Sequence, residues 1–66
     1  MNIKQIAEEA VDSIINGNTS SVIKEIQELN KKQAMAVTAI AVLLLAEDHS
    51  RQDALSFVNR LNSAAR

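Results

Sequence analysis

Apolar residues recur every three or four positions from Ile3 to Ile14, and charged residues fill the positions between them. This spacing is typical of an amphipathic helix with one buried face. Asn2 is suited to cap the beginning of the helix, and Asn16-Gly17 supplies a left-handed position at which helices commonly end. The pattern predicts a first helix with well-defined boundaries.

Residues 22–29 repeat this alternation over a shorter distance and predict a second helix of two to three turns. Ser20 or Ser21 is expected to cap it. Neither Gly nor Pro separates this helix from the apolar segment that follows, so one continuous helix is an alternative. We favour a break, because Asn30 followed by Gln33 resembles a capping box.

The third segment, AMAVTAIAVLLLA at residues 34–46, has Thr38 as its single polar residue, and no charge lies between Lys32 and Glu47. A helix that is apolar all round is expected at the centre of a fold. Its thirteen residues would rise only about 20 Å, whereas a membrane core is about 30 Å thick. The segment therefore predicts a core helix and not a membrane span.

A fourth helix is expected after Ser50, whose spacing to Asp53 suggests another capping box. Phe57 is expected beside the apolar stripe of this helix. The stripe itself carries Ala54, Leu55, Val58, Leu61 and Ala65. The four segments predict an all-α fold, a compact bundle of three to four short helices. They span residues 3–16, 20–29, 31–46 and 51–63 of a single domain, residues 1–66.

Composition supports this fold and adds a constraint on stability. Phe57 is the only aromatic residue, Gly17 is the only glycine, and proline and cysteine are absent. Strands and hairpins therefore lack their usual residues, and disulfides are excluded. A chain of 66 residues is near the lower limit for a single stable core, so oligomerisation is the expected source of further stability.

Charge is nearly balanced, at −1 overall, with acidic and basic residues interspersed. This distribution gives no sign of attraction to nucleic acid or to a membrane surface. The first residues, MNIKQIAEEA, are acidic before any long apolar run, unlike a secretory signal. We therefore expect a cytoplasmic protein.

Candidate chemistry is weak along the whole chain. The run EDHS at residues 47–50 offers reactive groups, but adjacent side chains point in different directions and cannot form a triad. His49 is better explained as a surface residue near a helix cap. The Glu-x-x-His spacing of di-iron bundles is absent. We expect no enzyme activity, no cofactor or metal, and no small-molecule substrate.

An apolar helix surrounded by only three short helices should keep part of its surface uncovered, and such a surface usually marks an interface. We therefore expect a homodimer with twofold symmetry. The predicted interface consists of Val37, Ile40, Ala41, Leu44 and Leu45.

Charges at the ends of the third helix bear on the same question. Lys31 and Lys32 precede it and Glu47 and Asp48 follow it, which opposes the preference of the helix dipole. An antiparallel partner would bring unlike ends together. Alternatively, a continuous second and third helix removes the lysines from a terminus, and the two acidic residues favour the start of the fourth helix.

Two functions remain under consideration. The first is a small regulatory or accessory protein, of the kind bacteria and their phages encode, that binds a larger protein. Glu8, Glu9, Arg51 and Arg60 are its candidate contacts. The alternative is a dimeric DNA-binding transcriptional regulator that uses the helix at residues 51–63. We favour the first, because carboxylates lie among these arginines and no basic stripe continues elsewhere.

Overall fold

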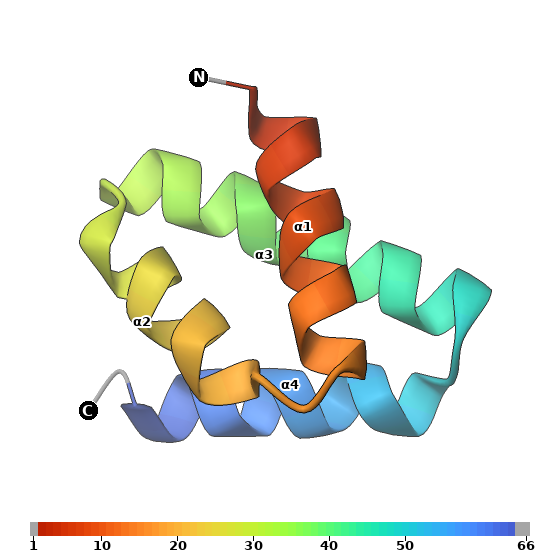
Figure 1. Cartoon of the computed structure of the whole chain (residues 1–66). Helices are drawn as coiled ribbons and strands as arrows, with labels where there is room; N and C mark the ends of the chain where they lie inside the picture. The colour runs from red at the N-terminus through yellow and green to blue at the C-terminus, as the bar shows by residue number, and fades with distance from the viewer. Residues whose placement is uncertain (1, 65–66) are drawn as a thin grey trace.

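The computed structural model describes residues 2–64, which form four α-helices (Figure 1). These are α1 (Ile3–Ile15), α2 (Thr19–Glu28), α3 (Lys31–Asp48) and α4 (Arg51–Ala64). The predicted all-α fold is confirmed, with each helix beginning within one residue of its predicted start. Ala65, which was expected on the apolar stripe of the fourth helix, lies outside the described residues.

Side-chain caps determine where α1, α3 and α4 begin. The acceptors are Asn2 Oδ1, Asn30 Oδ1 and Ser50 Oγ, which accept from the backbone amides of Gln5 at 3.1 Å, Gln33 at 2.8 Å and Asp53 at 3.1 Å. Each bond satisfies an amide that the first helical turn leaves free. The expected cap of α2 was wrong: the helix begins at Thr19, after Asn18, and Asn18 makes no side-chain capping bond.

The predicted break between the second and third helices is confirmed. Leu29 and Asn30 have extended backbones, with φ/ψ of −79°/156° and −66°/161°. The chain therefore turns before α3, and the lysines at its start stand at a true helix terminus. After α1, Gly17 adopts a left-handed φ of 88°, as its position predicted.

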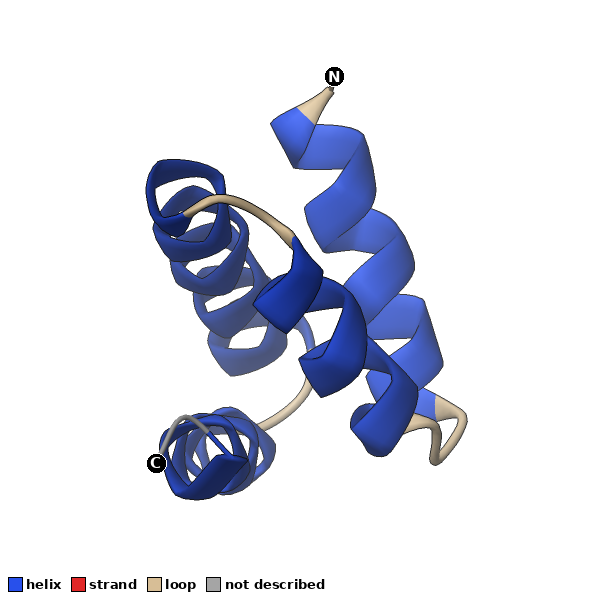
Figure 2. Cartoon of the chain, turned by 90° about the vertical axis from the view of Figure 1, so that its left-hand side faces the viewer, coloured by secondary structure: helices blue, strands red, loops and turns tan. Residues whose placement is uncertain are grey.

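The helices form two layers. In Figure 1, α3 and α4 run in opposite directions, and α1 crosses in front of α3. Figure 2 shows the arrangement from the side, with α3 and α4 on the left and α1 and α2 on the right. α3 contacts each of the other three helices. Within residues 2–64, no helix covers the side of α3 and α4 that faces away from α1 and α2.

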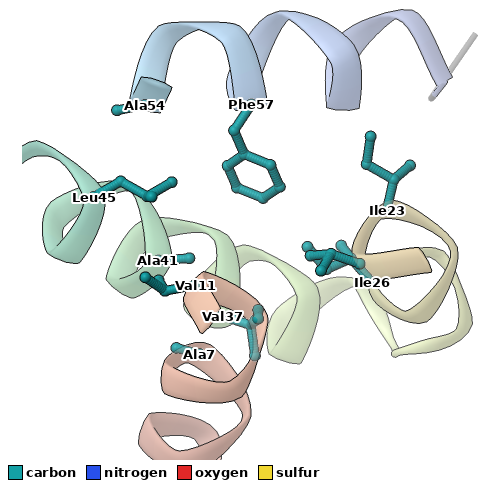
Figure 3. Packing of buried hydrophobic residues seen from close by; sticks show 11 residues of the cluster. Ala7, Val11, Ile23, Ile26, Val37, Ala41, Leu45, Ala54 and Phe57 are labelled. Atoms are coloured by element: carbon teal, nitrogen blue, oxygen red, sulfur yellow. The ribbon is translucent and has the colours of Figure 1, made fainter. Parts of the chain in front are cut away.

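The core lies between these layers (Figure 3). α3 contributes Val37, Ala41 and Leu45, each 0% exposed, and α1 contributes Ala7, also 0% exposed. Small alanines on both helices let their backbones approach closely. Phe57 of α4 is 1% exposed and points toward the centre of the cluster.

The predicted apolar stripe of α4 needs a correction. Leu55 was expected on the buried stripe, but its side chain is 64% exposed. Phe57 was expected beside the stripe, but it lies in the core. The reason is the angle at which α4 docks: Ala54 and Phe57, one turn apart, face the core, and Leu55 lies about 100° around the helix from Ala54.

Leu45→Ala should strongly destabilise the fold, because it leaves a cavity in the core cluster. We expect a loss of about 2–5 kcal/mol in the free energy of unfolding, out of a total of about 3–10 kcal/mol for a chain of this length. The matched control is Leu55→Ala, which should change stability by only about 0.5 kcal/mol. Urea denaturation followed by circular dichroism, at one protein concentration, measures both. Equal losses would contradict the assignment of Leu45 to the core.

Asn30→Ala should lower the melting temperature, because it removes the acceptor for the Gln33 amide. Loss of such a cap costs about 1 kcal/mol, which corresponds to about 4–8 °C for a small domain. Asn30→Asp keeps the acceptor and should preserve stability. If Asn30→Asp melts as low as Asn30→Ala, capping is not the role of this side chain.

Candidate protein-protein interface

One side of α3 presents apolar residues to solvent. Met35 is 65% exposed and Leu43 is 60% exposed, and the alanines at positions 39 and 46 are exposed as well. Residues three or four positions apart lie on one face of a helix. We call this stripe the outer face of α3: Met35, Ala39, Leu43 and Ala46. It lies opposite the buried stripe, because Ala39 follows Val37 by two residues, about 200° around the helix.

A shallow groove runs beside the first half of this face. It lies where the end of α2, the first half of α3 and the end of α4 meet. Met35 and Ala39 form part of its lining, together with Thr38 of α3 and Leu61 of α4. The apolar surface offered to a partner therefore extends from the outer face of α3 toward α4.

The residues predicted for a dimer interface lie mostly inside the fold. Val37, Ala41 and Leu45 are 0% exposed, so a second molecule could reach them only if the fold opened. Ile40 and Leu44 are half-buried and pack against the core cluster. In this fold, the surface that α3 offers to another molecule consists of other residues.

Sequence reasoning missed Met35 and Leu43, although the flanking charges carried a signal. Lys32 lies three positions before Met35, and Glu47 lies four positions after Leu43. Both charged side chains therefore continue the outer face. Charged side chains are almost never fully buried, so Lys32 and Glu47 are consistent with an exposed outer face. Asp48, in contrast, lies three positions after Leu45, on the side of the buried stripe.

The four charged residues predicted as partner contacts are all exposed, but the structure does not gather them into one patch. Glu8 lines a hollow with Asp48 of α3, whereas Glu9 lines a different hollow beside α2. Arg51 and Arg60 are nine residues apart on α4. They lie on opposite sides of that helix, since each residue turns it by about 100°.

Arg60 also takes part in a contact within the chain. Its guanidinium donates a hydrogen bond to Ser20 Oγ of α2 at 3.0 Å. Nearby, the Gln27 side-chain amide donates to the Ala64 carbonyl at 3.0 Å. These bonds join α2 to α4, so Arg60 helps to connect two helices of the fold.

Another hollow, at the end of α1, is lined partly by polar residues of α4 and of the turn that precedes it. His49, Asp53, Ser56 and Arg60 surround it, and Phe57 forms part of its lining. The run EDHS joins two helices: α3 continues two residues past its predicted end at residue 46 and includes Glu47 and Asp48, His49 follows, and Ser50 caps α4 as expected. Within residues 2–64, no group of three His, Asp or Glu side chains could hold a metal ion.

No helix within residues 2–64 combines the length and the hydropathy needed to cross a membrane. No protein-family model, no curated protein and no solved structure matches the chain. Function therefore has to be inferred from the fold and from the surface of the described residues.

DNA binding should be weak and unspecific, because Arg51 and Arg60 point to opposite sides of α4 and cannot enter one groove together. Fluorescence anisotropy with a pool of random duplexes, at two salt concentrations, measures it. We expect any binding to fall steeply with salt, since it depends on phosphate contacts. A selected duplex bound with nanomolar affinity, and released on Arg51→Glu, would instead establish α4 as a recognition helix.

Proposed function

We propose that this chain is a non-enzymatic helical binding protein that acts through protein-protein contacts, in a regulatory or accessory role. The contact surface is the outer face of α3. The observation that supports it most directly is the exposure of Met35 and Leu43, at 65% and 60%, on the side of α3 opposite its buried residues. Contiguous apolar surface on a small protein usually marks an interaction site.

The size of this surface indicates the kind of partner. Full burial of a Leu or Met side chain contributes about 1.5–3 kcal/mol, so covering the exposed parts of Met35 and Leu43 contributes roughly 1–2 kcal/mol each. Association costs about 4–15 kcal/mol in lost freedom of motion. A partner must therefore cover more than these two side chains. We infer a protein surface that spans the outer face of α3 and its neighbouring groove.

Two features support protein contact over the alternatives. Arg51 and Arg60 do not share a side of α4, which argues against reading DNA with that helix. His49 shares a hollow with Asp53, Ser56 and Arg60, but within residues 2–64 no side-chain hydrogen bond links it to any of them, as the pairing of a catalytic base with its orienting group would require. The outer face of α3, with its exposed Met35 and Leu43, is therefore the surface best suited to bind a partner.

Site-specific photo-crosslinking tests the proposal. A photoreactive amino acid at Leu43 should form covalent adducts with protein in a lysate of the source organism, because this position meets the partner. The same probe at Lys24, an exposed residue of α2, is the control and should form few adducts. Mass spectrometry identifies the products. Equal labelling from both positions, or none from Leu43, would refute the outer face of α3 as the contact surface.

A further inference from the structure

We propose that the outer face of α3 binds the same face of α3 in a second copy of this chain. The two α3 helices run antiparallel, and a twofold axis near Ala39 relates the two copies. This inference rests on the proposed function, because it names a partner for the contact surface. The apolar residues determine where the contact forms. The charged ends of the helix determine which partner fits and in which direction.

Charge along α3 is confined to its two ends. Lys31 and Lys32 begin the helix, Glu47 and Asp48 end it, and all four are exposed, whereas residues 33–46 carry no charge. Each end opposes the helix dipole. An antiparallel copy brings its acidic end to the basic end of the first copy and compensates both. A parallel copy would place like charges together.

The positions of these charges define the register. Lys32 lies seven residues before Ala39, and Glu47 lies eight residues after it. At a rise of about 1.5 Å per residue, both lie about 10–12 Å from Ala39 along the helix. A twofold axis at Ala39 therefore brings Lys32 beside Glu47 of the second copy, and symmetry repeats the pair at the other end.

The apolar residues match in the same register. Met35 and Leu43 each lie four residues from Ala39, so Met35 of one copy meets Leu43 of the other. Ala39 at the axis has no side chain beyond Cβ, which lets the two helices approach to about 8 Å. The groove that Met35 and Ala39 line is then adjacent to Leu43 of the second copy. The face is thus complementary to itself, as a twofold interface requires.

Sedimentation equilibrium tests self-association. The wild-type chain should have twice the 7.2 kDa mass of one copy. Leu43→Glu should raise the dissociation constant by at least about 100-fold, because it buries a charge twice in an apolar contact. Leu55→Glu, the same change at an equally exposed leucine of α4, should leave the mass unchanged. Loss of the dimer in Leu55→Glu alone would overturn the pairing of α3 with α3.

Disulfide trapping tests the axis and the direction, and the chain contains no cysteine to interfere. Ala39→Cys should form a disulfide with its own copy, since residues at a twofold axis come within about 4 Å at Cβ. Ala46→Cys is the matched control. In the antiparallel pair, the two copies of position 46 are about 20 Å apart and should not join. Efficient trapping through Ala46→Cys would indicate a parallel pair and overturn the proposal.

Charge-reversal variants distinguish the contribution of the intermolecular ion pairs to dimerisation from the effect of the same charges on the stability of α3. Lys32→Glu and Glu47→Lys each improve the match to the helix dipole within one chain. Each should nevertheless raise the dissociation constant about threefold to tenfold at low salt, because like charges then meet across the axis. The double variant should restore dimerisation. Unchanged affinity in both single variants would overturn the register centred on Ala39.

The outcome for self-association can be separated from the outcome for the proposed function. A mass of one chain at every concentration up to about 1 mM, where even weak dimers form, overturns the dimer. If a probe at Leu43 still crosslinks a different protein, the proposed function stands without it. If that probe also forms no adduct, both are overturned.

Discussion

The packing of α1 against α3 is the contact on which the rest of the structure depends. Ala7 and Ala41 are both fully buried, and these small residues let the two helices lie close together. Once α1 occupies that side of α3, Leu45 points toward α4, and Phe57 closes the core from there. A single aromatic ring suffices because the other side chains of the core cluster are aliphatic and the helices are short. Because α1 packs on this side of α3, Met35 and Leu43 on the opposite side remain exposed to solvent.

The helix boundaries could be predicted because local chemistry determines them. The caps at Asn2, Asn30 and Ser50 each involve an amide only three residues away, so the sequence contains both partners. The start of α2 was harder to predict. Asn18, Thr19, Ser20 and Ser21 are all suitable caps, and the helix begins without a side-chain capping bond. Where several residues suit one position, tertiary packing decides among them.

The interface could not be predicted in the same way, because α3 has apolar residues at every angle. A single-faced helix such as α1 shows which side is buried, but the pattern in residues 34–46 is compatible with any orientation. Which side faces inward depends on Ala7 and Phe57, which are distant in sequence and select Val37, Ala41 and Leu45. The type of side chain does not indicate burial either, since Leu43 is 60% exposed and Leu45 is 0% exposed.

The charges at the two ends of α3 depart from the usual preference of the helix dipole. Natural sequences usually place acidic residues in the first turn and basic residues in the last, and α3 does the reverse at both ends. Such a departure costs about 0.3–1 kcal/mol per residue. Glu47 and Asp48 offset part of it, because they shortly precede the start of α4, where acidic residues are favourable. Departures of this kind tend to occur at functional sites. In α3 the reversed charges border the exposed apolar stripe of Met35, Ala39, Leu43 and Ala46, and the proposed antiparallel copy would bring opposite charges to both ends.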